Sequence, residues 1–225
     1  MKVADVKVVG VDDAGRGAAI GPLVIAGVLL EEKALSKLID LGVKDSKLLS
    51  PRRREQLAEE IKELALGFHV EKSTPTTIDK VTGTGKKLHR LNRLEAQIMA
   101  KVVKVLEPDI VYVDASDVLA DRFGKHIADN VPFEVRIISE HHADAKYPIV
   151  SAASIIAKVE RDNIISELRK KHGDLGSGYP SDPKTIKFLE NWIRDFACFP
   201  EFVRKSWKPV KKIKAEAKAK QTKLV

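Results

Sequence analysis

Short apolar runs alternate along the chain with segments whose apolar residues recur at helical spacing. The runs predict buried strands at residues 8–11, 23–30, 68–72, 110–114 and 133–138. The helical segments cover residues 31–41, 51–66, 88–106, 117–129, 145–171 and 183–196. Strands that alternate with helices indicate an α/β fold, here with a mixed β-sheet flanked by helices on both faces.

Two adjacent acids and an arginine framed by glycines follow the first predicted strand. Asp12 and Asp13 come directly after its apolar residues, and Gly15, Arg16 and Gly17 form a glycine-framed turn behind them. Carboxylates at the end of a buried strand must accept hydrogen bonds or bind a ligand. A regular strand would direct the two carboxylates to opposite faces, so both reach one site only if the strand unwinds into the turn. The alternative is that both acids are turn formers of the Asx type.

Two further acids occupy comparable places. Asp114 ends the apolar strand at residues 110–114, and Asp144 stands just before the long helix predicted at 145–171. In open α/β sheets ligands collect where strands end. Oxygen-only ligands select hard ions such as Mg²⁺ or Mn²⁺, and two such ions can promote phosphodiester hydrolysis. The alternative for Asp144 is an acid that caps a helix N-terminus.

Several other residues that could bind nucleotides or metals lack the spacing of a binding site. The segment 83–86 is rich in glycine but lacks the spacing of a nucleotide-binding loop. His141 and His142 lack the ligand spacing of a zinc site. We expect His89 and Glu95, on the helix at 88–106, to be solvated or capping groups rather than ligands.

We expect the protein to be cytoplasmic. No apolar run approaches the roughly 20 residues of a membrane helix, and the first residues lack the pattern of a secretory signal. Cys198 is the only cysteine, so an internal disulfide is excluded. The formal charge is +8, and residues 208–225 hold seven lysines against Glu216. The excess therefore lies mostly in the tail, where it attracts polyanions without sequence preference.

Six motifs together resemble the ribonuclease HII family, in particular its archaeal type, over residues 6–207. They occur in the family's order and read DDAGRG-x-x-IGPLV-x-AG, KDSKLLS, VDA after an apolar strand, HHADAKYPIVSAASIIAKVERD, GSGYPSDP and VRKSW. The resemblance implies an RNase H-like fold with a small helical C-terminal part. We expect a catalytic core over residues 1–172, a helical substrate-binding part over 173–207 and a basic flexible tail over 208–225.

The resemblance also implies an activity, which is metal-dependent cleavage of RNA in RNA–DNA hybrids and cleavage 5′ to ribonucleotides embedded in duplex DNA. Such cuts remove misplaced ribonucleotides and replication primers. The substrates would be these duplexes, and the protein would act as a monomer away from membranes. The cofactor would be Mn²⁺ or Mg²⁺, bound as a pair of ions.

Carried over position by position, the resemblance makes Asp12, Asp13, Asp114 and Asp144 the catalytic metal ligands. Asp162 competes for the fourth place, but its neighbour Arg161 favours a surface ion pair.

The resemblance further assigns substrate binding to residues outside the acids. These are Gly15, Arg16, Gly17, Lys47, Lys158 and Tyr179. Glycines let the backbone approach a ribose 2′-OH, the group that separates RNA from DNA. Tyr179 matches the tyrosine that stacks near the RNA–DNA junction, with a loop aromatic that covers the core as its alternative. Lys47 and Lys158 match basic positions near phosphates and could equally be solvated.

One site residue departs from the family, because Asp13 stands where the family has glutamate. The shorter side chain reaches about 1.5 Å less far. Mg²⁺ demands a near-ideal octahedron, so we expect Mn²⁺ to support activity better. The departure keeps open a catalytically impaired RNase H-fold module that only binds nucleic acid. A nuclease of this fold with another substrate, such as DNA junctions or that of the type-three hybrid nuclease, is the second alternative. The GRG turn and Tyr179 argue against it.

The end of the tail carries one further motif. Gln221 and Leu224 resemble the start of a sliding-clamp-binding peptide, but the aromatic pair that normally follows is absent. We favour a disordered lysine-rich tail over a clamp-binding peptide.

Overall fold

The computed structural model describes residues 5–43, 49–83 and 87–222. The chain divides into two compact units, each built from separate stretches of sequence. Unit 1 spans residues 1–14, 24–72 and 88–160, and unit 2 spans 15–23, 73–87 and 161–225. The boundary expected near residue 172 stays a prediction of the sequence.

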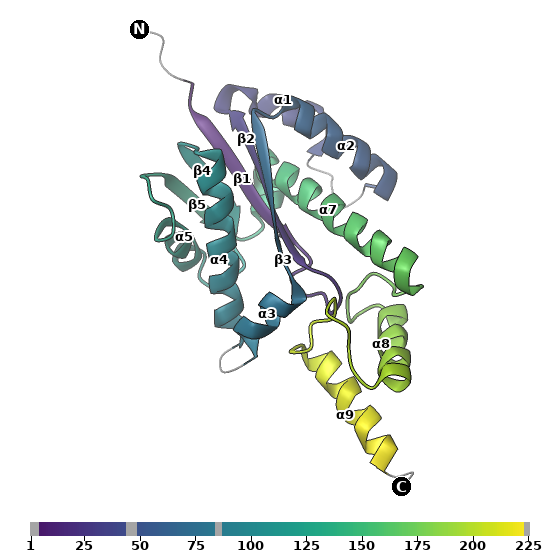
Figure 1. Ribbon diagram of the computed structural model, residues 1–225. Helices are drawn as coiled ribbons and strands as arrows, with labels where there is room; N and C mark the ends of the chain where they lie inside the picture. Colours follow the sequence, from purple (N-terminus) through teal and green to yellow (C-terminus); the bar gives the residue numbers. More distant parts are fainter. Residues whose placement is uncertain (1–4, 44–48, 84–86, 223–225) are drawn as a thin grey trace. The chain divides into compact units, whose positions relative to one another are not determined.

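Unit 1 is built on a five-stranded sheet of order β3-β2-β1-β4-β5 (Figure 1). The strands are β1 (Lys7–Ala14), β2 (Leu23–Glu31), β3 (Gly67–Ser73), β4 (Ile110–Asp114) and β5 (Arg136–Glu140). β1 pairs antiparallel with β2 and parallel with β4, and β4 pairs parallel with β5. The mixed sheet predicted from the sequence is confirmed.

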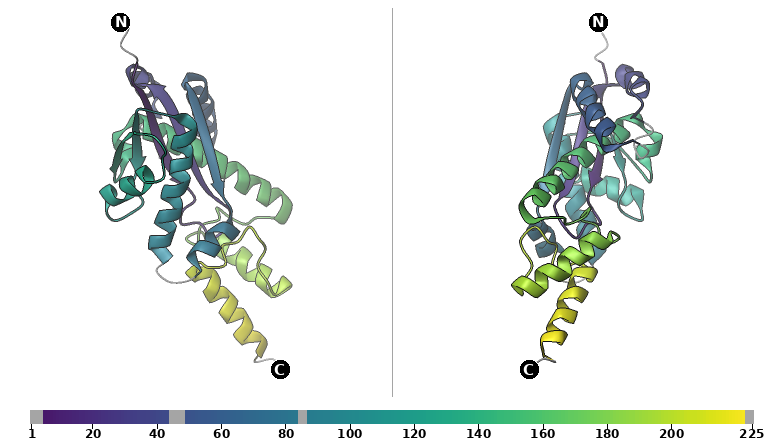
Figure 2. Two further views of the ribbon diagram at one scale, coloured as in Figure 1. Left: turned by 60° about the vertical axis from the view of Figure 1, so that its left-hand side comes forward. Right: turned by 90° about the vertical axis from the view of Figure 1, so that its right-hand side faces the viewer.

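Two glycines show which helices cover the two faces of this sheet. A side chain at Gly10 in β1 would meet the carbonyl oxygen of Ile149 at 2.2 Å, so α7 (Pro148–His172) approaches closely there. A side chain at Gly27 in β2 would meet Val102 of α4 (Lys87–Leu106) at 2.4 Å. Gly27 pairs with Val11, the residue after Gly10, and successive strand residues face opposite ways. Hence α7 and α4 lie on opposite faces, as Figure 2 also shows.

The remaining helices of unit 1 are short or medium in length. They are η1 (Glu32–Ala34), α1 (Leu35–Asp40), α2 (Pro51–Leu64), α5 (Ala120–Ala128) and α6 (Ala143–Lys146). Ser50 caps α2, since its hydroxyl accepts from the N–H of Arg53 at 3.3 Å. The single helix predicted over 145–171 is wrong, because Tyr147 is extended and separates α6 from α7. The residue before a proline avoids helical angles, and Pro148 follows Tyr147.

Unit 2 contains α3 (Pro75–Thr82), the end of α7, α8 (Pro183–Phe196) and α9 (Lys208–Thr222). The sequence analysis missed α3, although Thr74 caps it and Pro75 is its first residue. The flexible tail expected from residue 208 is instead helical to Thr222. Val210 and Ile213 lie one turn apart and are buried, so one face of α9 packs although the rest is rich in lysine.

Within the described residues, no helix combines the length and the apolar composition that crossing a membrane requires.

Candidate active site

Asp12 and Asp114 lie at neighbouring positions on adjacent parallel strands. Val11 of β1 pairs with Val113 of β4, and the two aspartates are the next residues of their strands. Both therefore share the face that Gly10 presents to α7. Asp12 is buried, with 6% of its surface exposed, and the hydroxyl of Ser154 in α7 donates a hydrogen bond to it. The expectation that two strand ends would bring acids together is confirmed for this pair.

The surroundings of Asp12 disfavour its charged form. Burial raises the pKa of Asp12 well above its ordinary value, and the neighbouring charges of Asp13 and Asp114 raise it further. The Ser154 hydroxyl and the N–H of Asp13, which donates to Asp12 Oδ1 at 2.7 Å, act in the opposite direction. Because like charges lie beside this buried carboxylate, a bound cation would stabilise its charged form.

Asp13 is placed differently from the expectation of an unwound turn. β1 continues through Ala14, and Asp12 and Asp13 pair with Ala26 and Ile25 of β2. The strand pleat therefore directs the two side chains to opposite faces. Asp13 is half-buried and contributes to the site through its charge next to Asp12.

The short helix α6 brings Asp144 toward Asp114. The N–H of Ala143, the first residue of α6, donates to Asp114 Oδ1 at 2.8 Å, and Asp144 is the next residue. Asp144 is buried in the first turn of α6. The N-cap position of α6 belongs to His142, whose φ of 57° is left-handed, so Asp144 is not the N-cap residue.

A polar cluster that the sequence analysis missed holds α6 to the sheet. Glu140 pairs with Asp114 across β4 and β5, and it accepts from the hydroxyl of Tyr147 at 2.8 Å and from Lys146 Nζ at 2.6 Å. Tyr147 also packs on Tyr112 of β4, with 4.6 Å between the ring centroids. The motif HHADAKYP contains two of these residues, but nothing in its spacing reveals that they meet Glu140.

The donor set fits a hard divalent cation. The acids offer only carboxylate oxygens, the ligands that Mg²⁺ and Mn²⁺ prefer. In the part of the chain that the structure describes, no three Asp, Glu, His or Cys side chains are already gathered as a ready coordination group. The strands and α6 thus bring the acids to one end of the sheet without a preformed ligand cage.

Unit 2 contains the glycine-framed turn and the loop of Tyr179. Gly15 has a φ of +87°, and a side chain there would meet Arg161 at 2.7 Å, so only glycine fits. The N–H groups of Ala19 and Ile20 both donate to the carbonyl of Gly178, at 2.8 and 3.1 Å. The structure therefore brings two of the predicted substrate-binding segments together within one unit.

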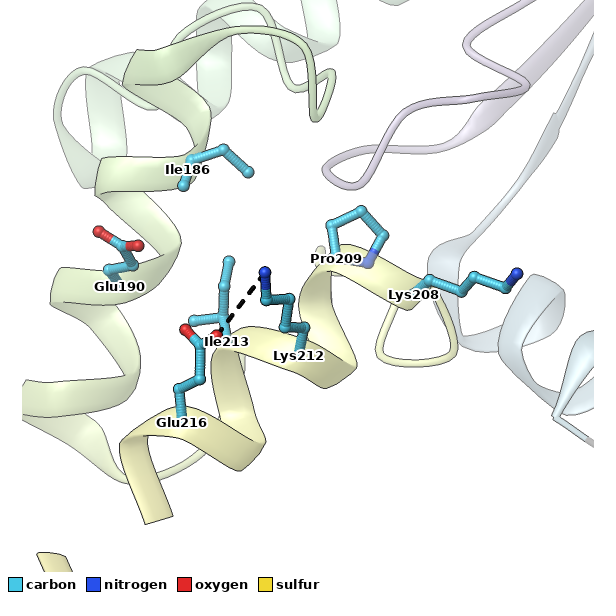
Figure 3. Close-up of a pocket in the computed structure, with 7 residues that line it drawn as sticks. All are labelled: Ile186, Glu190, Lys208, Pro209, Lys212, Ile213 and Glu216. Atoms are coloured by element: carbon cyan, nitrogen blue, oxygen red, sulfur yellow. Dashed lines mark ion pairs between the residues drawn. The ribbon is translucent and has the colours of Figure 1, made fainter. Parts of the chain in front are cut away.

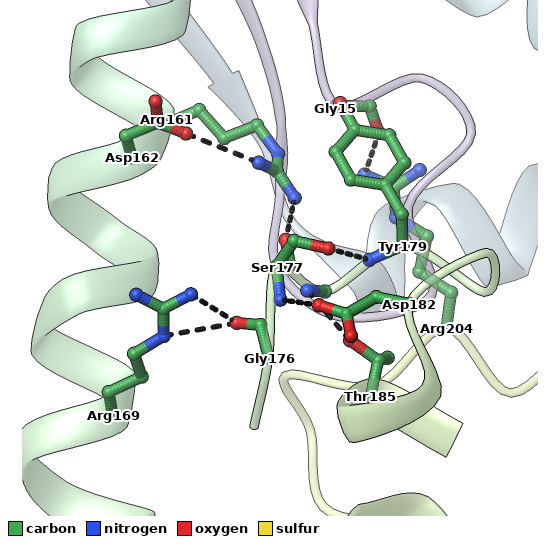
Figure 4. Close-up of polar contacts among 11 residues, drawn as sticks. Gly15, Arg161, Asp162, Arg169, Gly176, Ser177, Tyr179, Asp182, Thr185 and Arg204 are labelled. Carbon is green, nitrogen blue, oxygen red and sulfur yellow. Dashed lines mark hydrogen bonds and ion pairs between the residues drawn. The ribbon is translucent and has the colours of Figure 1, made fainter. Parts of the chain in front are cut away.

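Tyr179 rests on a buried arginine (Figure 4). The guanidinium carbon of Arg161 lies 4.3 Å from the ring centroid, and Arg161 Nη2 donates to the carbonyl of Ser177 at 2.8 Å. Arg161 does pair with Asp162 at 3.4 Å, but it is only 2% exposed. The expectation of a surface ion pair is therefore wrong for Arg161 and holds for Asp162, which is 42% exposed.

The other predicted residues are placed as follows. Lys158 is half-buried on α7, one turn after Ser154 and so on the same side of that helix. Lys47 and Leu224 lie outside the described residues, as does most of the segment 83–86. Glu95 is fully buried, so the expectation that it is solvated is wrong.

Unit 2 also has a groove of about 560 Å³ between α8 and α9 (Figure 3). Its lining mixes apolar and charged side chains from Ile186, Glu190, Lys208, Pro209, Lys212, Ile213 and Glu216. None of the predicted site residues lines it.

Comparison with known proteins agrees with this arrangement. The family model for ribonuclease HII matches residues 9–210. Ribonuclease HII of Pyrococcus furiosus is 46% identical over 220 residues, which cover 97% of this chain and 96% of the relative.

Solved structures give the same result. The crystal structure of ribonuclease H2 from Pyrococcus horikoshii has a TM-score of 0.87 at 43% identity and covers 94% of this chain and 99% of its own. The structure of the PCNA:RNase HII complex from Archaeoglobus fulgidus has a TM-score of 0.82 at 42% identity, with coverage of 92% and 96%.

The sheet order, the paired acids on adjacent parallel strands and these structural matches define a nuclease of the RNase H-like fold. Within that class the family match is specific and spans most of the sequence. The chain belongs to the ribonuclease HII family, whose members are divalent-metal-dependent ribonucleases H. This membership decides against the type-three hybrid nuclease.

Proposed function

We propose that this protein hydrolyses the RNA strand of RNA–DNA hybrids and cuts duplex DNA on the 5′ side of embedded ribonucleotides, in the cytoplasm. The observation that carries the proposal is the buried carboxylate of Asp12, held beside Asp13 and Asp114. A carboxylate in this position is costly unless a cation joins it. Carboxylate oxygens bind hard divalent ions, and such ions promote phosphodiester hydrolysis, so a divalent metal ion is the cation that we expect here.

The four acids lie on three elements of unit 1. Asp12 and Asp114 would hold ions from neighbouring strands, and Asp144 would complete the set from α6. Asp13 leaves β1 on the face opposite Asp12, so its carboxylate would reach the ions from a less favourable direction. Two bound ions would stabilise the attacking and leaving oxygens of the scissile phosphodiester. Ser154 orients the carboxylate of Asp12, and the N–H of Ala143 orients that of Asp114. Both hydrogen bonds leave other carboxylate lone pairs available.

We assign recognition of the nucleotide at the RNA–DNA junction to elements of unit 2. The turn Gly15-Arg16-Gly17 can approach a ribose closely because Gly17 is exposed and has open space around it. Arg16 can contact a phosphate in fork geometry. Tyr179 presents a half-buried ring that is backed by Arg161, as stacking on a sugar or base requires. Lys47 and Lys158 are assigned to phosphates.

The metal preference is part of the proposal. Asp13 is shorter than the family's glutamate, and the regular strand around it leaves little freedom to compensate. Mn²⁺ tolerates displaced ligands better than Mg²⁺, which requires near-ideal octahedral geometry. We expect both ions to support cleavage, with Mn²⁺ giving the higher rate.

A second candidate partner is a sliding clamp. The Archaeoglobus fulgidus relative was solved as a PCNA:RNase HII complex. In this chain, Gln221 and Leu224 are the residues that such a clamp would bind. A pull-down with the clamp of the same organism, with and without residues 221–225, tests this, and equal retention of both forms would contradict it.

One assay tests the main proposal. A DNA duplex with a single ribonucleotide, labelled at the 5′ end, is incubated with protein and Mg²⁺ or Mn²⁺. We expect a cut on the 5′ side of the ribonucleotide, no cut in the all-DNA duplex and no cut by Asp114→Asn. Binding of the substrate without cleavage in either metal would contradict the proposal.

A further inference from the structure

Arg204 is a fully buried arginine whose guanidinium is bound to one turn of the chain. Its Nη2 donates to the carbonyl of Gly15 at 2.7 Å, its Nη1 to that of Arg16 at 2.8 Å and its Nε to that of Gly21 at 3.1 Å. Figure 4 shows Arg204 reaching Gly15 from the C-terminal segment. Three nitrogens of one side chain thus hold three carbonyls of residues 15–21.

The backbone around Arg204 strengthens this link. The N–H of Arg204 donates to Ala19 at 2.9 Å, and Ile20 forms a β-bridge with Val203. Trp207 places its ring 5.0 Å from the Arg204 guanidinium and donates from Nε1 to the carbonyl of Gly17 at 3.3 Å. Residues 203–207 therefore form a cradle for the turn, and all of these contacts lie within unit 2.

The cradle determines the direction of the peptide N–H groups. In a trans peptide the carbonyl of one residue and the N–H of the next point in opposite directions. Because the carbonyls of Gly15 and Arg16 point to the buried Arg204, the N–H groups of Arg16 and Gly17 point away from it. Arg16 is half-buried and Gly17 is exposed, so this is the outer side of the turn. Successive N–H groups directed to one side attract anions and sugar oxygens.

Without such a cradle a glycine turn would not keep this orientation. Glycine adopts positive and negative φ with similar ease, so a peptide beside Gly15 or Gly17 can rotate. A rotated peptide would present a carbonyl oxygen where a phosphate or a ribose hydroxyl oxygen needs a donor. The planar guanidinium fits the task, since its donors form a rigid fork that an ammonium group lacks.

We propose that Arg204 is a positioning residue that fixes the peptide planes of Gly15-Arg16-Gly17 so that their N–H groups face the ribonucleotide. Trp207 assists through its bond to Gly17. The inference rests on the proposed function of the turn in binding the nucleotide. It adds that recognition of the sugar depends on a buried side chain that never touches the nucleic acid.

The test compares Arg204→Lys and Trp207→Phe with a stability control in the same unit. Ile193→Val in α8 removes one buried methylene and touches none of the carbonyls of the turn. The measurements are KM and kcat on the single-ribonucleotide duplex, together with the unfolding temperature. We expect R204K to raise KM about tenfold and W207F about threefold, with kcat at saturation almost unchanged. I193V should lower the unfolding temperature and leave KM as it is.

A binding experiment separates this inference from the proposed function. In an Asp114→Asn background, fluorescence anisotropy gives the dissociation constants for the ribonucleotide duplex and for the same duplex in all-DNA form. A protein with intact Arg204 that does not prefer the ribonucleotide duplex would contradict the proposed function of the turn. A preference that survives unchanged in R204K would overturn the role of Arg204 alone. Should R204K fail to fold, W207F decides, and an unchanged preference there overturns the inference.

Discussion

At the scale of single residues, the site depends on carboxylates that the fold brings close together. Asp12 is the extreme case, because burial and the charges of Asp13 and Asp114 all raise its pKa. Asp12 and Asp13 lie on β1, Asp114 lies on β4 and Asp144 lies on α6. A substitution at one acid therefore probes the site more than the fold.

Asp13→Glu is expected to increase cleavage with Mg²⁺ relative to Mn²⁺. The added methylene extends the carboxylate by about 1.5 Å, which restores the reach that an octahedral ion requires. The measurement is the ratio of initial rates in the two metals on the single-ribonucleotide duplex. Asp162→Glu makes the same change at an exposed ion pair and should leave the ratio unaltered. An unchanged ratio in D13E would show that the shorter acid is not limiting.

Asp117 gives a prediction for acid stability. Burial raises its pKa, but hydrogen bonds from Arg122, Asn92 and the N–H of Leu119 outweigh burial and lower the pKa to about 2. An acid with a lowered folded pKa stabilises the protein above its unfolded pKa, and this stability is lost as the pH falls toward 2. The contribution near pH 7 is about 2 kcal/mol.

Asp117→Asn should therefore lower the free energy of unfolding by about 2 kcal/mol at pH 7 and by less as the pH falls below 4. Urea unfolding at several pH values measures this. A constant difference between the two proteins from pH 7 to pH 3 would mean that the charge of Asp117 is not the cause.

At the scale of elements, close backbone approach explains how α7 reaches the site. Gly10 lets the start of α7 lie against β1, and Ser154 follows on the same helix and reaches Asp12. The sequence analysis gave Gly10 no role, since a glycine inside an apolar run carries no mark of what packs on it. Packing of this kind depends on residues far apart in the chain.

Gly10→Ala should destabilise the protein by roughly 1–3 kcal/mol and reduce cleavage, because the new methyl group would meet the Ile149 carbonyl oxygen at 2.2 Å. Gly67→Ala in β3 is the matched control, since its methyl group would lie 3.6 Å from Leu106 in ordinary contact. Thermal unfolding and the cleavage rate measure both variants. Equal effects of G10A and G67A would contradict the role of this approach.

Prediction from the sequence succeeded for some kinds of element and failed for others. The strands and the helices of strong periodicity, such as α4 and α8, were predicted because their apolar faces are visible in the sequence. The split between α6 and α7 was missed because periodicity continues across Pro148. α9 was missed because Val210 and Ile213 are few among lysines, and only their burial shows that the helix packs.

The candidate site was predictable in its acids and less so in its supports. Asp12, Asp114 and Asp144 were found from strand ends, a helix start and the family resemblance. Arg161 and Arg204 were not, because a buried arginine looks like a surface residue in a sequence. Their roles depend on backbone carbonyls of distant loops, which no local pattern encodes.

At the scale of the whole molecule, positive charge is concentrated at the C-terminal end. Residues 208–225 carry seven of the lysines, and α9 orders most of this segment. Lys211 and Lys214 are exposed on α9. Such charges bind phosphates without regard to sequence.

The double variant Lys211→Gln and Lys214→Gln should weaken binding of every duplex alike. We expect the slope of log K against log salt to fall by about 2, with the preference for ribonucleotides retained. Binding isotherms at several salt concentrations measure this. Lys101→Gln with Lys104→Gln removes the same charge from α4 and serves as the control. A slope that falls equally in both double variants would show that α9 has no special part.

The most direct test of the account is the affinity of the protein for Mn²⁺, measured from the loss of the free-ion electron paramagnetic resonance signal. We predict that the unaltered chain binds Mn²⁺ and that Asp12→Asn and Asp114→Asn each weaken binding at least about tenfold. Asp162→Asn, which removes an acid outside the cluster, should bind as the unaltered chain does. Binding that is the same in D12N, D114N and D162N would contradict the assignment of the metal centre to these strands.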